Sequence, residues 1–366
     1  MSEKPRVSVV LPIYNGSKYM RKSIESVLKQ TFPDFELIIV DDCSEDDTYN
    51  IAISYSCNND RVRVIKNQQN RGLPASLNVG FSMAKGEYLT WTSDDNIYHE
   101  AAIKKMVNFL DLNKEYALVY ADMNLIDENG NKMGIRNGGD GNLYKGNCVG
   151  ACFLYKNECK KIIGNYSENK IYVEDYDYWL RIAGRFKIGR IHEILYDYRY
   201  HNNSLTIKKI KQIGMNLSNL RYEYMNSIAK NVDSEELRNI VFEMIVCGDD
   251  RAIQYVDDKT KDDVQFVYHR NKQIHSKQIW IFGAGGLGRS AIKILQGKSI
   301  EGFIDNDRNK IGSEIEGKKI ISLKEYIQKY QDSNIVIAVD LKYAYSICRQ
   351  LRAVGIDDAV LLYDLC

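Results

Sequence analysis

The stretch YLTWTSDDNIY, residues 88 to 98, is the one around which this chain is organised: a short apolar run ends just before two adjacent carboxylates, Asp94 and Asp95. Open α/β sheets bind ligands at the carboxyl ends of their strands. If both carboxylates face a cleft, their oxygens suit a hard cation, Mg²⁺ or Mn²⁺, held with a diphosphate from a substrate. The alternative is that the Asp-Asp-Asn cluster caps the following helix, because Asp and Asn are favoured at helix starts.

The residues before this stretch alternate between β-branched runs and segments with helical spacing of apolar residues. Three strand-helix alternations precede the carboxylate pair, which predicts a mostly parallel, doubly wound α/β sheet with right-handed crossovers. The expected strands are 6–12, 35–40, 61–65 and 86–91, and the expected helices are 18–28, one opening at 44–48, and 73–84.

The pattern continues to about residue 205. We expect a hairpin turn at Asn129-Gly130 and a helix over Val173 to Ala183 whose first turn is acidic. The glycine-rich segment RNGGDGN, Arg136 to Asn142, is either a mobile lid or a disordered surface loop. The other expected elements are a helix at 101–112 and strands at 117–121, 149–155, 187–191 and 194–200.

Composition excludes several classes of function. The 366 residues carry 50 Lys and Arg against 49 Asp and Glu, so bulk charge does not favour a nucleic-acid partner. The first residues do not resemble a signal peptide, and no apolar run reaches the roughly 18 residues of a spanning helix. We expect a soluble, cytoplasmic chain whose 8 cysteines are reduced, and leave peripheral membrane association and a homo-oligomeric state open.

Two further segments follow, so the expected division is residues 1–205, 206–272 and 273–366. From Thr206 the strands stop, and apolar residues three or four apart predict a long amphipathic helix from Ile207 to Ile228, followed by a second at Glu235 to Cys247. The apolar stripe indicates intramolecular packing or a partner helix. Lysines near its start, at 208, 209 and 211, indicate a solvated face or contact with anionic lipid.

The last segment predicts a small Rossmann-like α/β domain. A strand runs into Gly283-x-Gly285-x-x-Gly288 and a helix, and a later strand ends at Asp305, near the fingerprint distance for a ribose hydroxyl. The unit is about half the size of a dinucleotide-binding domain, and no dehydrogenase constellation follows it. It therefore either forms a second nucleotide site or only packs against another part of the chain or a partner.

Three acidic pairs stand at ends of elements in the first segment: Asp41 with Asp42, Asp94 with Asp95, and Glu174 with Asp175. They lie within VSVVLPIYNGSKYMRKSIESVLKQTFPDFELIIVDDCSEDDT, NRGLPASLNVGFSMAKGEYLTWTSDDN and VEDYDYWLRI. In these motifs and their order, residues 5 to 205 closely resemble the family 2 glycosyltransferases of the GT-A fold. The resemblance implies an inverting transfer of sugar from a nucleotide-diphospho-sugar, with UDP as the expected nucleotide.

The resemblance also implies roles for single residues. Asp42 would bond the base or ribose, Arg71 would reach base or phosphate, Asp94 would lie near the ribose, and Asp95 would coordinate the metal. Pro12 and Tyr14, just past the first strand, are candidates for seating a pyrimidine, although Tyr14 is alternatively a buried core residue and Arg71 a surface cation. His201 is a candidate for completing a Mn²⁺ site, with a purely structural histidine as the alternative.

Asp175 is the candidate general base and Glu174 its neighbour in the motif. A helix N-terminus lowers the pKa of a carboxylate, whereas a base benefits from a raised one, so burial and the Glu174 charge would have to outweigh the dipole. No residue pattern indicates a covalent nucleophile, which favours inversion. Trp91 and Trp179 are expected in the core.

These residues are compatible with three functions to different degrees. The leading one is a metal-dependent glycosyltransferase in surface polysaccharide biosynthesis, acting on a glycan or lipid-linked acceptor. A sugar nucleotidyltransferase would need a glycine-rich, basic loop after the first strand, where this chain has PIYNGSKY. A catalytically silent sugar-nucleotide-binding or scaffold protein is disfavoured by the intact acidic set.

Overall fold

The computed structural model describes residues 4–139, 141–201, 209–268, 274, 278–330 and 333–365, and gives 265–268 without their side chains. The chain divides into two compact units, Met1–Leu220 and Arg221–Cys366, each taken here by itself. The expected linker boundaries at 206 and 272, together with Asp140 and Lys208, lie outside the described residues. The three-part division of the chain therefore stays a prediction.

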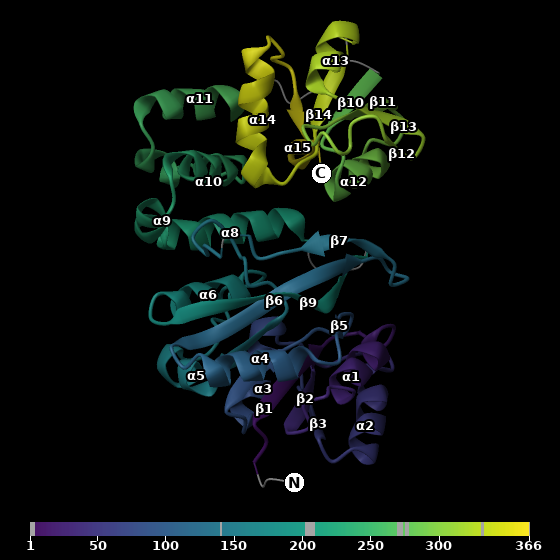
Figure 1. Cartoon of the computed structure of the whole chain (residues 1–366), viewed down its shortest axis with the longest axis vertical. Coiled ribbons are helices and arrows are strands. Elements are labelled where there is room, and N and C mark those ends of the chain that lie inside the picture. The colour runs from purple at the N-terminus through teal and green to yellow at the C-terminus, as the bar shows by residue number, and fades with distance from the viewer. Residues whose placement is uncertain are drawn as a thin grey trace. The chain divides into compact units, whose positions relative to one another are not determined.

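The first unit contains the predicted doubly wound sheet (Figure 1). Its first four strands are parallel and lie in the order β3-β2-β1-β4. They are β1 Val7–Ile13, β2 Phe35–Asp41, β3 Val62–Lys66 and β4 Tyr88–Trp91, joined by the helices α1 Met20–Leu28, α2 Thr48–Asn58 and α3 Leu73–Met83. Because β1 lies between β2 and β4, the carboxyl ends of these three strands meet at one edge.

The sheet then continues with strands of mixed direction, in the order β4-β8-β6-β9-β5. β8 is antiparallel to both β4 and β6, whereas β9 is parallel to β6 and lies beside it in Figure 1. The strands are β5 Ile97–Tyr98, β6 Tyr116–Ile126, β7 Lys132–Arg136, β8 Phe153–Lys156 and β9 Lys187–Arg199, with helices α4 Ala102–Leu112, α5 Asn157–Ile163 and α6 Glu174–Ala183. The hairpin predicted at Asn129-Gly130 joins β6 to β7.

Two expectations for this region are wrong. The strand expected at 149–155 begins only at Phe153 and ends at Lys156. The segments 187–191 and 194–200 do not form two strands, because β9 is continuous from Lys187 to Arg199. Ala121 of β6 pairs with Ile191 of β9, and the next residue, Asp122, pairs with Ile194. The two residues of β9 between these partners form a bulge, so the strand continues without ending.

Alternation along the central strands assigns the two faces of the sheet. Val9 and Leu11 belong to a buried cluster that includes residues of α1, α2 and α4. Val10 faces the other way, toward α3, where a Cβ on Gly80 would lie 2.4 Å from its Cγ1. Glycine at position 80 therefore lets α3 approach the sheet closely.

The second unit contains a separate, mainly parallel sheet in the order β12-β13-β11-β10-β14-β15, the α/β architecture expected for residues 273–366. Only the hairpin of β12 with β13 is antiparallel. The strands are β10 Gln278–Phe282, β11 Ser299–Ile304, β12 Glu314–Ile315, β13 Lys318–Ile321, β14 Asn334–Ile337 and β15 Val360–Leu361, and the helices are α12 Gly286–Ile294, α13 Leu323–Lys329, α14 Leu341–Ala353 and α15 Leu362–Leu365.

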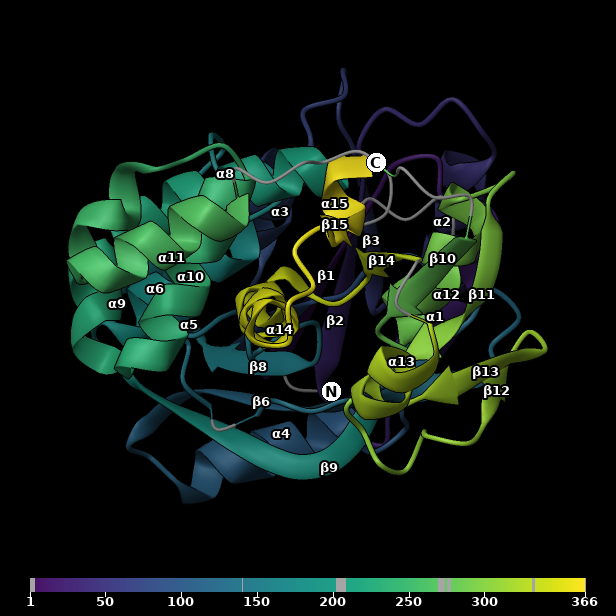
Figure 2. The same ribbon diagram turned by 90° about the horizontal axis from the view of Figure 1, so that it is seen from above.

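The helices that follow β9 in the sequence correct the expected single helix over 207–228, because the chain turns at Tyr224 and the first helix ends there. Figures 1 and 2 both place α14 between β14 and the pair α10 and α11, and Phe242 of α10 packs 5.4 Å from the Tyr345 ring of α14. The helices are α8 Ile210–Glu223, α9 Met225–Asn231, α10 Ser234–Val246, a 3-10 turn at Arg251–Tyr255 and α11 Asp258–Tyr268.

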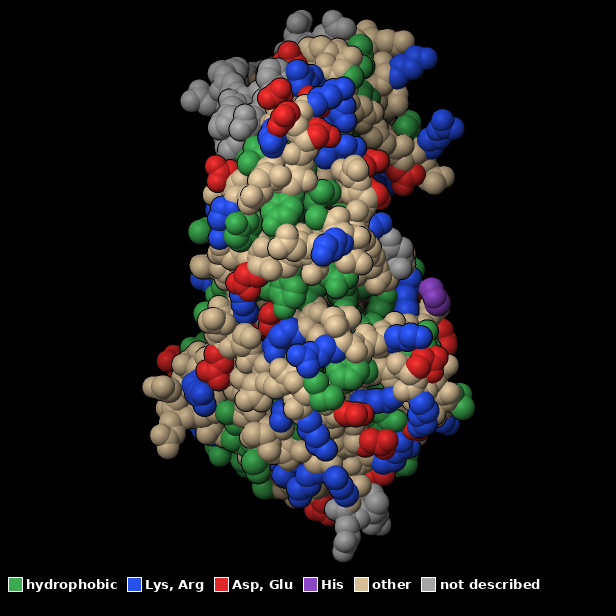
Figure 3. Space-filling model, turned by 90° about the vertical axis from the view of Figure 1, so that its left-hand side faces the viewer, with side chains coloured by type: hydrophobic (Ala, Val, Ile, Leu, Met, Phe, Trp, Pro, Cys, Tyr) green, Lys and Arg blue, Asp and Glu red, His purple; other side chains and the backbone are tan. Residues whose placement is uncertain are grey.

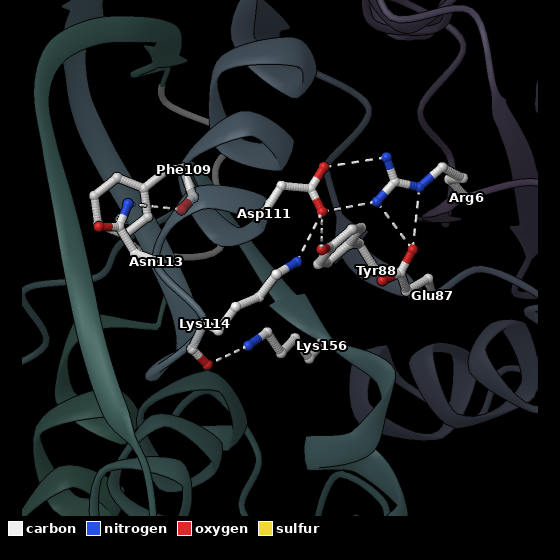
Figure 4. Close-up of polar contacts among 8 residues, drawn as sticks. All are labelled: Arg6, Glu87, Tyr88, Phe109, Asp111, Asn113, Lys114 and Lys156. Carbon is white, nitrogen blue, oxygen red and sulfur yellow. Dashed lines mark hydrogen bonds and ion pairs between the residues drawn. The ribbon is translucent and has the colours of Figure 1, made fainter.

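A charge network closes the end of the first sheet opposite its carboxyl edge (Figure 4). Arg6, just before β1, donates two hydrogen bonds to Asp111 of α4, at 3.1 and 2.9 Å, and its Nη2 lies 3.0 Å from Glu87. The Tyr88 hydroxyl donates to the same Asp111 carboxylate at 2.8 Å. The Arg6 guanidinium, above all, lowers the pKa of Asp111 to about 2.

We predict that Asp111→Asn lowers the free energy of unfolding at pH 7 by about 1 kcal/mol, the upper range for a partly exposed ion pair. Because the folded pKa lies below the usual value near 3.9, this stability is present above about pH 4 and is lost as pH falls toward 2. Urea denaturation at pH 7 and pH 3 measures it. Glu128→Gln, at an exposed pair 3.9 Å from Lys18, should change little. Equal losses for both variants, or a loss independent of pH, would contradict this account.

Candidate functional site

Asp94 and Asp95 lie at the carboxyl end of β4, in the loop before β5. The N–H of Thr92 still bonds to Val10 of β1, at 3.0 Å, so the strand holds the start of this loop in place. The helix that follows, α4, has Ala101 at its N-cap and no side-chain cap. The capping alternative for the Asp-Asp-Asn cluster is therefore wrong.

Asp95 and His201, the two predicted metal ligands, lie together. The His201 Nε2 atom is 3.0 Å from Asp95 Oδ2, and both side chains are largely buried. Ser93 Oγ donates to the other carboxylate oxygen at 2.7 Å. A carboxylate oxygen and an imidazole nitrogen, 106 positions apart in sequence, are thus in direct contact, and their use as metal ligands stays a prediction.

Arg199, which no sequence motif marks as a site residue, holds this pair in place. Its Nε donates to the backbone carbonyl of Asp95 at 2.9 Å, and its own N–H donates to Asn96 Oδ1 at 2.8 Å. The side chain is buried and also bonds the carbonyl of Asp127. Its position two residues before His201 was the only signal in the sequence.

Asp94 packs against the loop after β1. A Cβ on Gly16 would lie 2.1 Å from Asp94 Oδ2, so any larger residue there would displace the Asp94 carboxylate. Burial, with a smaller contribution from the Asp95 charge, raises the pKa of Asp94 to about 7. Gly16 was also missed as a site residue, although it lies in the quoted PIYNG motif, where a glycine after a strand marks a close backbone approach.

Asp42 accepts hydrogen bonds from the loop between β3 and α3. Its carboxylate accepts the backbone N–H groups of Arg71 and Gly72, at 2.9 and 2.8 Å, and the Asn67 amide at 2.8 Å. The Arg71 side chain is partly exposed and lies 3.8 Å from Glu168. The structure thus brings Asp42 and Arg71 together, whereas their contacts to a base or phosphate stay predictions.

Pro12 and Tyr14 flank the carboxyl end of β1. Pro12 is buried within the strand, and Tyr14, just past its end, has 48% of its surface exposed. The buried-core alternative for Tyr14 is therefore wrong. Its ring is open to a ligand at the same edge of the sheet as Asp42.

Glu174 and Asp175 form the first turn of α6, after Tyr172 with a strained φ of 68°. Glu174 is 4% exposed, its Oε2 has no hydrogen-bond partner among the described residues, and burial followed by the Asp175 charge raises its pKa to about 8. Burial also raises the pKa of Asp175, against hydrogen bonds from the Tyr176 N–H and Asn147. Burial therefore outweighs the helix N-terminus.

Aromatic rings connect α6 to β4, the strand that leads to Asp95. Trp91 of β4 lies 5.8 Å from Phe153 of β8, whose ring lies 4.5 Å from Trp179 of α6. Trp179 is fully buried, as expected, and Trp91 is partly buried. A single cleft shared by Asp95 and Asp175 stays a prediction.

In the second unit, the loop that carries the glycine motif is hydrogen-bonded to Asp305. Gly283 has a φ of +112°, and a Cβ on Gly288 would lie 1.9 Å from the Gly283 carbonyl, so both positions require glycine. Asp305 Oδ2 accepts the Ala284 N–H at 2.8 Å, and Lys310 lies 3.2 Å away. The contacts of Asp305 are thus made within the chain, and binding of a nucleotide by Gly283, Gly285, Gly288 and Asp305 stays a prediction.

Two surface properties bear on partners. The face drawn in Figure 3 carries basic and acidic side chains interspersed. Among the residues that the structure describes, no helix combines the length and the apolar character needed to cross a membrane.

Comparisons with known proteins fit this geometry. Residues 8–168 match the sequence model of glycosyl transferase family 2, and residues 275–361 match that of the "C2185-like, N-terminal" family. Two solved structures share the fold, each with a TM-score of 0.51. Staphylococcus aureus TarS 1–349 in complex with UDP is 18% identical, with 71% of this chain and 86% of that chain covered. The mannosyltransferase PcManGT of Pyrobaculum calidifontis, in complex with GDP-Man and Mn²⁺, is 14% identical, with 72% and 74% covered.

Curated relatives match a little over half of the chain. An uncharacterized glycosyltransferase of Rickettsia typhi, RT0329, is 31% identical over 57% of this chain and 68% of its own length. The putative glycosyltransferase EpsE of Bacillus subtilis is 33% identical over 54% and 74%. Chondroitin synthase of Escherichia coli is 29% identical over 56%, and this chain spans only 30% of it. Because relatives more than 30% identical are matched over two thirds or more of their length, the chain belongs to glycosyl transferase family 2 and is a glycosyltransferase.

Proposed function

We propose that this chain moves a sugar from a UDP-sugar to an acceptor hydroxyl with inversion, assisted by Mn²⁺ or Mg²⁺. The observation that carries the proposal is the 3.0 Å contact between Asp95 and His201, next to Asp94 at the carboxyl end of β4. Pairs of this kind place a hard cation where a diphosphate can join it.

The donor atoms fit the cation. Among the described residues, no group of three or more His, Cys, Asp and Glu side chains forms a complete metal cage. Mg²⁺ is commonly bound by one or two carboxylates together with substrate phosphates and waters, an arrangement to which Asp95 would contribute one carboxylate. His201 would add an imidazole nitrogen, a common metal ligand. A bound cation would neutralise the diphosphate as it leaves. The PcManGT structure, which contains Mn²⁺ and GDP-Man, supports this use of the fold.

The nucleotide is assigned to the edge formed by β1, β2 and β4. The exposed Tyr14 ring and the backbone at Pro12 would seat the base, Asp94 would lie near the ribose, and Arg71, on the loop clasped by Asp42, would reach the base or phosphate. TarS, whose structure contains UDP, supports a uridine nucleotide.

Asp175 would act as the general base. As the acceptor oxygen attacks the anomeric carbon, its proton passes to the Asp175 carboxylate, and the bond to the diphosphate breaks on the opposite face. One displacement of this kind inverts the anomeric configuration. Burial raises the pKa of Asp175, which makes its carboxylate a better base than an exposed aspartate.

The acceptor would be a glycan or a lipid-linked sugar in polysaccharide biosynthesis at the inner face of a membrane. The match to chondroitin synthase, whose name denotes polysaccharide assembly, supports this class.

We predict that Asp175→Asn lowers turnover by about 10² to 10⁴, the usual range for general acid-base catalysis, while donor binding stays within about twofold. Initial rates of UDP release and calorimetric binding of UDP measure the two effects. Asp111→Asn, the same change at the opposite end of the sheet, is the matched control and should leave turnover unchanged. Unchanged turnover in Asp175→Asn would move the base elsewhere.

For the metal pair, we predict that Asp95→Ala abolishes the Mn²⁺-dependent part of UDP binding and of activity. His201→Ala should weaken Mn²⁺-dependent binding at least tenfold, because loss of a mere supporting partner of a metal ligand already costs about 10 to 100-fold. Titration of Mn²⁺ in the presence of UDP measures both. His99→Ala, at a second histidine–aspartate contact of 2.9 Å with Asp197, is the control. Mn²⁺ dependence preserved in both Asp95→Ala and His201→Ala would contradict the metal assignment.

A thermal-shift panel of UDP-, GDP- and dTDP-sugars and NAD, each with and without Mn²⁺, tests the donor. We expect UDP-sugars with Mn²⁺ to stabilise most, by about 2.7 kcal/mol at 100 times Kd. Asp95→Ala should remove that stabilisation, and a shift that survives in this variant would indicate a second site. Stabilisation by NAD alone would contradict the donor assignment.

A further inference from the structure

Asn147 lies in the connection between β7 and β8 and contacts the carboxylate of Asp175. Its Nδ2 donates to Asp175 Oδ2 at 2.8 Å, and the Tyr176 N–H donates to Oδ1 at 2.6 Å. The other end of the Asn147 amide, Oδ1, accepts the Gly150 N–H at 3.2 Å. Because Gly150 supplies a donor, the oxygen must face Gly150 and the nitrogen must face the carboxylate.

The backbone around Asn147 is itself anchored. Arg136, at the end of β7, donates to the Asn147 carbonyl at 2.8 Å. Asp122 of β6 accepts both Arg190, at 2.8 Å, and the Gly138 N–H, at 3.3 Å. A Cβ on Gly138 would lie 2.3 Å from the Tyr120 ring, so glycine is required where this segment crosses β6. The glycine-rich segment is thus fixed to the sheet at the end that follows β7, and Arg136 at that end bonds the backbone of Asn147.

We infer that Asn147 is a positioning residue for sugar transfer: its amide holds the Asp175 carboxylate in the orientation in which that carboxylate receives the acceptor proton. The inference rests on the proposed function, in which Asp175 is the base. With one donor on each oxygen, the carboxylate does not rotate freely, and each oxygen keeps a lone pair for the acceptor hydroxyl. Misplacement of a reacting group by about 1 Å can cost roughly 100-fold in rate.

The effect of Asn147 on the pKa of Asp175 can be tested by experiment. The Asn147 hydrogen bond and the Arg136 charge both lower the pKa of Asp175, against burial. Among the described residues, Glu174 in its own helix and the Tyr166 phenol also interact electrostatically with this carboxylate. Removing the Asn147 donor therefore raises the pKa of Asp175 and moves the acid limb of the rate profile to higher pH. A purely structural role would leave that limb in place.

The test measures UDP release by hydrolysis, between pH 5.5 and 9 with Mn²⁺, from the UDP-sugar that stabilises the wild-type chain most. Asn147→Ala should lower kcat by about 10 to 100-fold with KM within about twofold, and move the acid limb up by about one pH unit. Asn147→Asp, which has the same shape and adds a like charge, should move it further and serves if the alanine variant does not fold. Asn137→Ala, in the same segment but with its side chain exposed, is the control and should resemble wild type.

Two results distinguish failure of this inference from failure of the proposed function. If Asp175→Asn loses turnover while the Asn147 variants keep an unshifted acid limb, the inference is overturned and the proposed function stands. If Asp175→Asn keeps full turnover, or no UDP-sugar is hydrolysed, the proposed function itself fails.

Discussion

The contact between Asp95 and His201 is the interaction on which the catalytic unit depends. It joins the loop after β4, in the parallel part of the sheet, to a residue two positions past the end of β9, and β8 and β6 lie between these strands. Arg199 reinforces it by bonding the Asp95 carbonyl. A buried carboxylate and imidazole are costly unless they are paired or bind an ion, and here each satisfies the other, while their use as metal ligands remains a proposal.

Hydrogen-bond donors separate the carboxylates of this chain into two groups. Asp111 and Asp305 are surrounded by donors, their pKa values are lowered, and each ties together segments distant in sequence. For Asp94 and Glu174, burial outweighs their donors and raises the pKa to about 7 and about 8. Raised values at the ends of secondary-structure elements are typical of groups that bind or move charge during a reaction.

Much of the architecture was predictable because the parallel strands are buried runs and their helices have clear apolar spacing. The acidic pairs could be located because they directly follow those runs or open a helix, and the pairing of Asp95 with His201 was predicted as a metal site. The single strand β9 could not be predicted, since a register shift opposite Asp122 leaves no mark on its own residues. Gly16 and Asn147 were missed because their roles depend on contacts with residues far away in the sequence, and pattern analysis cannot place such contacts.

The central claim is that one cleft of the first unit holds the cation, the diphosphate and the base. A crystal structure of the chain with UDP and Mn²⁺, with the anomalous signal of manganese, tests it most directly. The account predicts manganese bound to Asp95 and His201, the diphosphate beside it, and the Asp175 carboxylate facing the same cavity. Manganese bound away from Asp95, or Asp175 on the other side of the sheet with no cavity in common, would contradict it.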